Sequence, residues 1–410
     1  KEWGKNLPLH LNGMWAFGFY RDRDNQIFIS RDRFGKKPLY YFSDENNLII
    51  SSEIKSIFHL TGKKRILNKD HLIFFLHTNY WNNEDKTTLY KGVYKVLPGE
   101  DITIDLESLS LKSHYENTLE NYFSSNHNLD DLDKVISDAV KKRLTADVPI
   151  GVFLSGGVDS SLVASYAYDH KSNITFISSK SKGSKDYIYS KKASEFLKLP
   201  IQQISNDYSE TAIRRLQKMT KYFELPIPFA GISFGMNALY ETANQQGIKV
   251  TLDGTGGDEI FGGYYDYYGP SFIEGSLRTF SIYNILSFIF FSFFYPYGSY
   301  RVIKETLIRI FYKAFKPTFL SENRINFTNN NPFSKSKTEL LFPKNTNSLS
   351  SFQAYDLRLG RLQTWLQIND LNSMMYSIES RSPLLDFRLL QFLEIKDNYK
   401  FRRGFNKYFL

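Results

Sequence analysis

Short apolar runs separated by turn-forming residues fill the first part of the chain. The runs MWAFGFY, QIFIS, LYYF and LIISSE lie within residues 14–53 and are bounded by clusters of Asp, Asn, Gly and Pro. Apolar runs of about four to eight residues, bounded in this way, are typical of antiparallel strands. Residues 91–104 continue the pattern. We therefore expect a largely β first region, in which no catalytic cluster is evident.

The pattern changes after a polar stretch, residues 116–133, where we place a boundary between a first domain (1–118) and a second (128–410). Apolar positions in residues 132–144 then recur at helical spacing. A β-branched run, VPIGVFL, leads through SGGVDSS into an apolar helix, LVASYAYDH. Strand, glycine-rich loop and helix in this order open a βαβ unit of a parallel sheet.

The alternation of strands and helices continues beyond this unit. Further strands are expected at residues 174–178 and 248–253, and helices at 188–197 and 209–222. This order predicts a doubly wound α/β domain with a parallel sheet, and the residues from Tyr264 onward are expected to be mainly helical.

Composition narrows the class of protein. The chain has 410 residues, enough for two or three domains, and its 42% hydrophobic and 16% aromatic content excludes a disordered chain. The net charge is +9, but Lys and Arg are interleaved with 43 acidic residues, so we expect a basic enzyme and no nucleic-acid partner. There is no cysteine, which is compatible with a cytoplasmic protein. The first residue is Lys1, and we expect a piece of a longer protein.

One uncharged segment, residues 279–300, raises the question of a membrane span. It contains Asn284, Pro296 and Gly298, and its apolar run is shorter than the roughly 20 residues that a span needs. We expect a buried or surface-hydrophobic pair of helices here, not a membrane-attached segment.

The loop SGGVDSS, residues 155–161, has the chemistry of a phosphate site. Its two glycines let the backbone approach an anion closely, and the N-terminus of the following helix favours negative charge. Asp159 is an acid where phosphate is expected, which makes sense if it holds Mg²⁺ between carboxylate and phosphate oxygens. The expected nucleotide-binding residues of this loop are Leu154, Ser155, Gly156, Gly157, Val158, Asp159, Ser160 and Ser161.

This loop is not a P-loop, since G-x-x-x-x-G-K-[ST] is absent. It resembles the SGGxDS loop of N-type ATP pyrophosphatases, which hold the pyrophosphate that leaves ATP. The resemblance alone covers GMP synthetases, NAD synthetases, argininosuccinate synthetases, tRNA-modifying thiolases and asparagine synthetases.

Three further segments select among these families. Residues 253–264, DGTGGDEIFGGY, look like the glycine-rich motif of asparagine synthetases, and place Asp258 as a second Mg²⁺ ligand beside Asp159. Residues 369–392 are similar to another segment of that family. There Glu379 and Arg381 either pair with each other, or Arg381 faces the carboxylates of the substrate. Residues 404–410 resemble the segment whose lysine neutralises the phosphates of ATP, which is Lys407 here.

The first region resembles the C-terminal half of a class II glutamine amidotransferase domain. The match R-D-x-x-G-x-x-P-L-Y-Y covers residues 31–41. The resemblance implies half of an Ntn-type α+β (αββα) domain in residues 1–118, whose Cys nucleophile and glutamine-binding residues lie upstream of Lys1.

Together the resemblances imply a glutamine-hydrolysing asparagine synthase. Such a ligase uses MgATP to activate the side-chain carboxylate of aspartate as an acyl-adenylate, releases pyrophosphate, and amidates the adenylate with ammonia from glutamine. A homodimer is compatible with the resemblance. The implied catalytic residues are Lys407, Glu259 and Thr255, and the implied nucleotide-binding residues outside the first loop are Ser178, Asp253 and Gly254.

Several positions depart from the family pattern. Thr255 stands where Glu is usual and cannot take a proton near neutral pH. Asp253 replaces a small Ser, Ser178 replaces an apolar residue expected against adenine, and Leu371 replaces an Arg. These departures leave open an acceptor other than aspartate, such as a sugar acid, and a non-catalytic paralogue that binds nucleotide.

Overall fold

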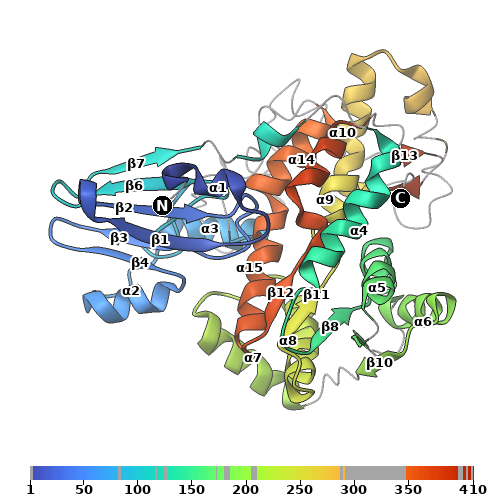
Figure 1. Cartoon of the computed structure of the whole chain (residues 1–410), viewed down its shortest axis with the longest axis horizontal. Coiled ribbons are helices and arrows are strands. Elements are labelled where there is room, and N and C mark those ends of the chain that lie inside the picture. The colour runs from blue at the N-terminus through green and yellow to red at the C-terminus, as the bar shows by residue number, and fades with distance from the viewer. Residues whose placement is uncertain are drawn as a thin grey trace, which may run out of the picture.

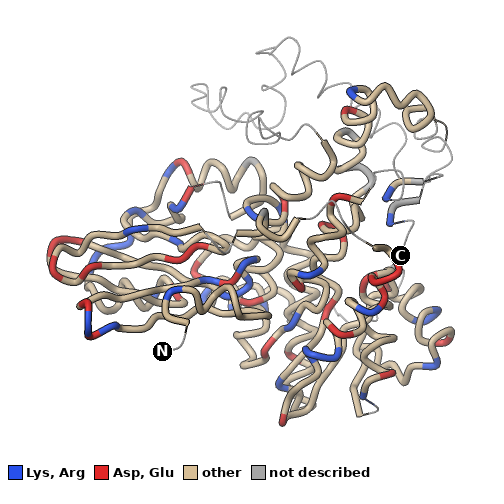
Figure 2. The backbone as a smooth tube through the Cα atoms, turned by 45° about the horizontal axis from the view of Figure 1, so that its top comes forward, with Lys and Arg blue, Asp and Glu red and all other residues tan. Residues whose placement is uncertain are grey.

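The computed structural model describes residues 3–81, 85–115, 118–123, 128–171, 173–179, 185–204, 210–286, 290, 348–395, 400–402, 405–407 and 410. Figure 1 shows a β-rich region formed by the first part of the chain, which lies beside a larger α/β region. Basic and acidic residues are interspersed along both regions (Figure 2).

The first region contains two antiparallel sheets. One has the order β1-β2-β6-β7 and the other β4-β3-β5. Alternate apolar side chains of the strands, such as Ile29, Ile102 and Ile104, are fully buried between the sheets. The strands are β1 (Ala16–Arg21), β2 (Gln26–Arg31), β3 (Tyr40–Ser43), β4 (Leu48–Ser51), β5 (Tyr94–Lys95), β6 (Asp101–Asp105) and β7 (Leu111–His114), and the α-helices are α1 (Leu7–His10), α2 (Ile54–Thr61) and α3 (Lys69–Thr78).

The second region is built on a five-stranded parallel sheet of order β10-β9-β8-β11-β12. Its strands are β8 (Ile150–Phe153), β9 (Thr175–Ser179), β10 (Ile201–Ile204), β11 (Val250–Leu252) and β12 (Glu379–Arg381). Its helices are α4 (Leu132–Arg143), α5 (Val158–His170), α6 (Lys185–Leu197), α7 (Glu210–Phe223), α8 (Ala230–Gln245), α9 (Gly257–Phe261), α10 (Tyr265–Arg278), α14 (Leu349–Arg358) and α15 (Arg361–Met374).

Helices cover both faces of this sheet. Val152 and its neighbours on one face pack in the same cluster as the apolar side of α4 and α5. Ile177, on the other face, packs with Tyr240 and Ala243 of α8. The doubly wound α/β fold expected from the sequence is therefore confirmed.

Two elements differ from the expectation. Residues 379–381 form strand β12 within a part of the chain expected to be mainly helical, because their backbone pairs with the edge of β11 through the carbonyl of Lys249 and the N–H of Asp253. Strand β10 also has no strong apolar pattern. Short edge strands are held by backbone hydrogen bonds, which leave little trace in the side-chain sequence.

Most of residues 279–300 lies outside the described residues, so the expected helical pair is not tested there. Within the part of the chain that the structure describes, no helix is both long and apolar enough to cross a membrane.

The two regions are joined by polar and aromatic contacts. The guanidinium of Arg33 lies 5.3 Å, 4.8 Å and 4.6 Å from the ring centres of Trp15, Tyr122 and Phe387, respectively. Its Nη1 donates to the carbonyl of Leu11 at 2.6 Å. A planar cation enclosed by three rings is difficult to replace with Lys, so Arg33 holds the first region, the connecting segment and the second region together.

Candidate active site

The loop between β8 and α5 has a backbone that requires glycine. Gly156 has φ of +80°, and a Cβ there would lie 2.1 Å from the carbonyl carbon of Tyr189 in α6. Gly157 is the N-cap of α5, so the loop ends at the positive end of a helix. The sequence therefore folds into an anion-binding turn at the carboxyl edge of the sheet.

Two serine hydroxyls shape this loop from inside. Ser160 Oγ lies 2.9 Å from Ser155 Oγ, accepts from the N–H of Ser155 at 3.2 Å, and donates to the carbonyl of Gly157 at 3.1 Å. The sequence predicts that these serines contact phosphate. In the structure their hydroxyls also hydrogen-bond within the loop and hold the turn closed.

A second glycine-rich loop follows the neighbouring strand β11 and packs directly on the first. A Cβ on Gly254 would lie 2.8 Å from both Cβ of Asp159 and the backbone nitrogen of Ser160. A Cβ on Gly257 would lie 2.6 Å from each carboxylate oxygen of Asp159. The two loops touch because β8 and β11 are adjacent parallel strands whose carboxyl ends meet at one edge.

Asp159, Asp258 and Lys407 meet where these loops touch. Lys407 Nζ lies 2.5 Å from Oδ2 of Asp159 and 2.6 Å from Oδ1 of Asp258. Lys407 comes from the C-terminal end of the chain, directly after the pair of strands β13 (Phe401–Arg402) and β14 (Phe405–Asn406). Three residues far apart in sequence thus form one charged cluster.

Burial and the opposite charges of the neighbouring groups act in opposite directions on the pKa values of Asp159 and Lys407. Burial raises the pKa of Asp159 to about 6; Lys407 opposes that rise and Asp258 adds to it. Burial by itself lowers the pKa of Lys407, but the two carboxylates outweigh it and the pKa is raised. Lys407 therefore stays charged, and its charge compensates the two acids.

The residues of the cluster fit Mg²⁺. Two carboxylates from separate loops already converge on one positive group, and Oδ1 of Asp159 is buried with no hydrogen-bond partner in the described structure. Nowhere among the described residues do three or more His, Asp or Glu gather as a metal cage. Mg²⁺ usually takes one or two carboxylates and completes its shell with phosphates and water, which is the donor set that this edge offers.

The other predicted catalytic residues, Glu259 and Thr255, are near Asp258 in the sequence, but their side chains have different surroundings. Glu259 is 2% exposed, and burial, with Asp258 and Asp356 nearby, raises its pKa to about 8. Tyr264 donates to its Oε1 at 3.0 Å. The backbone N–H of Thr255 donates to Oδ1 of Asp253 at 2.9 Å. Glu259 is thus a group that changes protonation near neutral pH, as Thr255 is not.

Asp253 lies in a polar network beneath the second loop. Its carboxylate accepts four hydrogen bonds, and the donors are Thr255, Asn369, Ser380 and Ser382. Ser178 is 2% exposed near the carboxyl end of β9, and its Oγ has no hydrogen-bond partner in the described structure. The donors Asn369 and Ser382 escaped the sequence analysis, because their spacing from Asp253 carries no local pattern.

The contacts of Arg381 decide between the two predicted roles, pairing with Glu379 or facing the carboxylates of the substrate. Its Nε donates to Oε1 of Glu379 at 2.7 Å, and its Nη1 donates to the carbonyls of Arg143 and Thr145 at 2.8 Å. Arg381 therefore fixes β12 to the end of α4. Leu371, where the family resemblance expects Arg, packs in an apolar cluster with Trp365 and Met375.

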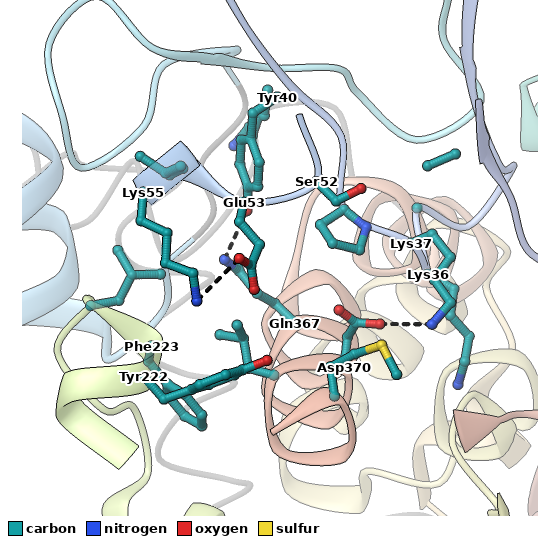
Figure 3. A pocket seen from close by; sticks show the side chains of 18 of the residues that line it. Lys36, Lys37, Tyr40, Ser52, Glu53, Lys55, Tyr222, Phe223, Gln367 and Asp370 are labelled. Carbon is teal, nitrogen blue, oxygen red and sulfur yellow. Dashed lines mark hydrogen bonds and ion pairs between the residues drawn. The ribbon is translucent and has the colours of Figure 1, made fainter. Parts of the chain in front are cut away.

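A cavity of about 770 Å³ lies between the two regions. Figure 3 shows two ion pairs in its wall: Lys37 points toward Asp370, and Lys55 toward Glu53. Gln367 of α15 donates to the hydroxyl of Tyr40 at 3.1 Å. The cavity is thus lined from both regions, next to the polar network of Asp253.

Comparison with known proteins matches the two parts of the chain to two family models. Residues 1–116 match the model of the glutamine amidotransferase domain, and residues 131–410 match that of asparagine synthase. An amidase, chry2, of Gibberella zeae is 30% identical over 297 residues, which are 67% of this chain and 43% of the relative. A putative glutamine-hydrolyzing asparagine synthetase 2 of Methanocaldococcus jannaschii is 32% identical over 278 residues, 64% of this chain and 51% of the relative.

The chain thus spans about half the length of the curated relatives that it matches. Among solved structures, the glutamine-dependent NAD⁺ synthetase of Acinetobacter baumannii in complex with ADP has a TM-score of 0.26 and 12% identity, and covers 62% of each chain. A TM-score this low bears on neither fold nor function. The family model matches most of the chain, and the chain belongs to the asparagine synthase family.

Proposed function

We propose that this chain is the ATP-dependent synthetase part of a glutamine-dependent asparagine synthase, a ligase that forms AMP. The observation that carries the proposal is the convergence of Asp159 and Asp258 on Lys407 at 2.5 Å and 2.6 Å, beside a glycine loop at a helix N-terminus. This arrangement suits the binding and departure of pyrophosphate.

In this proposal, ATP lies across the carboxyl edge of the sheet, with adenine between β9 and β11 and the β- and γ-phosphates in loop 155–161. The side-chain carboxylate of aspartate attacks the α-phosphorus, and pyrophosphate leaves. Two unit charges about 4 Å apart repel by on the order of 4 kcal/mol at an intermediate dielectric. Lys407 offsets this repulsion, and Mg²⁺ held by Asp159 and Asp258 would neutralise further phosphate charge.

Ammonia then attacks the acyl-adenylate, AMP departs, and the amide is the product. Because Thr255 does not accept a proton near neutral pH, we assign proton transfer to Glu259, whose pKa burial raises to about 8. In this proposal the first region, which matches the model of the glutamine amidotransferase domain, is part of the domain that supplies the ammonia. Since the chain has no cysteine, we propose that it uses free ammonia by itself.

The decisive test is Asp159→Ala. Pyrophosphate release from MgATP, aspartate and ammonium should fall at least about 100-fold, because the variant loses a carboxylate at the reacting phosphates. Asp169→Ala, an exposed position on the same helix α5, should keep wild-type activity. Circular dichroism checks that both variants fold. Full activity of folded Asp159→Ala would refute the site assignment.

One observation favours a carboxylate substrate other than aspartate. Leu371 lies in an apolar cluster where the resemblance expects Arg, so this position offers no cation to the substrate. A carboxylate of another kind, such as a sugar acid, is therefore the alternative. Product mass spectrometry with aspartate and with uronic acids separates the two. Pyrophosphate release that fails with every carboxylate would favour a non-catalytic nucleotide-binding paralogue.

Location in the cytoplasm and assembly as a homodimer belong to the same proposal. Light scattering of the purified chain tests the dimer.

A further inference from the structure

A lysine of the first region enters the second region and is buried there. Lys36, in the turn between β2 and β3, is 7% exposed, and its Nζ donates to Oγ of Ser382 at 2.5 Å. An ammonium removed from water costs several kcal/mol unless an opposite charge and hydrogen bonds compensate it. The charge of Lys36 therefore needs a partner on the far side of Ser382.

Asp253 is that partner. Ser382 Oγ donates to Oδ1 of Asp253 at 2.8 Å, so one hydroxyl connects the two charges. Asn369 Nδ2 and Ser380 Oγ donate to Oδ2 at 2.6 Å and 3.0 Å. Although burial acts to raise it, the pKa of Asp253 is lowered, chiefly by the charge of Lys36. Burial lowers the pKa of Lys36, and the charge of Asp253 opposes that change, so the two charges stabilise each other in part across the boundary between the regions.

Asp253 directly follows β11 and begins the loop that packs on the ATP site. The next residue, Gly254, has no space for a side chain between itself and Asp159, since a Cβ would lie 2.8 Å from Cβ of Asp159. Gly257 packs equally closely on the carboxylate of Asp159. Because nothing separates these backbones, a shift of Asp253 is transmitted to Asp159.

We propose that Lys36 is a positioning residue of the ATP site: through Ser382 it holds Asp253, and Asp253 holds the 253–257 loop against Asp159. The inference rests on the proposed function, because it concerns the ATP site of that function. It makes the amidotransferase region a structural part of the synthetase centre, in addition to its role in supplying ammonia.

Lys37 provides a matched control. It belongs to the same turn and crosses the same boundary, and its Nζ lies 2.9 Å from Oδ1 of Asp370 on α15 (Figure 3). It makes no hydrogen bond to Asp253 or to Ser382 in the described structure, and its ion pair is with Asp370 alone. Lys37→Met and Lys36→Met each remove one ammonium at this boundary, and only the second disturbs the network of Asp253.

The experiment measures the affinity for MgATP by isothermal titration calorimetry, without acceptor or ammonia. We expect Lys36→Met to bind MgATP at least tenfold more weakly than the wild type, and Lys37→Met to bind within twofold of it. The carboxylate of Asp253 accepts four hydrogen bonds from the protein, so we assign it to the support of the loop and not to contact with the nucleotide. The double variant Lys36→Met with Asp253→Asn should therefore recover to within threefold, because it removes both buried charges together.

The recovery distinguishes charge compensation from a simple packing loss. If the double variant binds MgATP no more tightly than Lys36→Met, the inference is overturned. Equal MgATP affinities of Lys36→Met and Lys37→Met would overturn it as well. A wild-type chain that binds no MgATP would instead refute the proposed function itself. The two failures are therefore distinguishable.

Discussion

Lys407 Nζ lies 2.5 Å from Oδ2 of Asp159, although 248 positions separate the two residues along the chain. The ammonium is largely buried, with 8% of the side chain exposed, and Asp258 lies on its other side at 2.6 Å. The last residues of the chain thus complete a site that begins in the first loop of the parallel sheet. A buried ammonium between two carboxylates is stable only while both partners remain in place.

Lys407→Met is predicted to lower the free energy of unfolding by on the order of 3 kcal/mol, because Asp159 and Asp258 lose the cation that compensates them. Added Mg²⁺ should stabilise the variant more than the wild type, since the ion replaces the missing charge. Urea unfolding at pH 8, with and without Mg²⁺, measures both effects. Lys134→Met serves as the control, because its side chain is 79% exposed. Equal stabilisation of variant and wild type by Mg²⁺ would contradict the prediction.

Gly156→Ala is predicted to destabilise the fold by about 2–4 kcal/mol and to abolish MgATP binding. The new Cβ would lie 2.1 Å from the carbonyl carbon of Tyr189, and φ of +80° is unfavourable for alanine. The matched change is Gly231→Ala on α8, where a Cβ meets nothing within 4 Å. That variant should be more stable than the wild type by about 0.5–1 kcal/mol. Thermal unfolding measures the stability of the two variants, and calorimetric titration measures their affinity for MgATP. Equal stability and equal affinity of the two variants would contradict the prediction.

Lys95 is predicted to make stability depend on pH. It is 6% exposed, and burial lowers its pKa to about 7. Between pH 7 and the ordinary lysine pKa of 10.5 the unfolded chain binds the proton more readily than the folded chain does. The contribution of this group to stability therefore rises with pH through that range, and below pH 7 its burial penalty is complete.

Lys95→Met should accordingly be more stable than the wild type at pH 7 by on the order of 3 kcal/mol, and this advantage should shrink toward pH 9.5. Urea unfolding at half-unit pH steps measures the difference. Lys63→Met, whose side chain is 50% exposed, should show a pH-independent difference. An advantage of Lys95→Met that grows with pH would have the wrong sign.

Much of the fold and part of the candidate site follow from the sequence. The glycines and Asp159 of loop 155–161 lie between an apolar strand and an apolar helix, which is a local pattern. Strand β12 lies in a part of the chain for which the sequence predicts mainly helices, because Glu-Ser-Arg has no apolar alternation and is held in the sheet by backbone pairing. The network of Lys36, Ser382 and Asp253 was also missed, because it joins residues from three distant segments.

The sequence by itself determined most of the elements, the glycine loops and the family resemblance, because periodicity and motif spacing are properties of neighbouring residues. Only the tertiary structure decided that Lys407 meets Asp159 and Asp258, that Arg381 pairs with Glu379, and that Lys36 is buried beside Ser382. The physical reason is that burial and charge compensation depend on which groups, far apart in the sequence, are buried next to each other in the folded protein. That proximity is set by how the sheet edge, the two loops and the first region pack together.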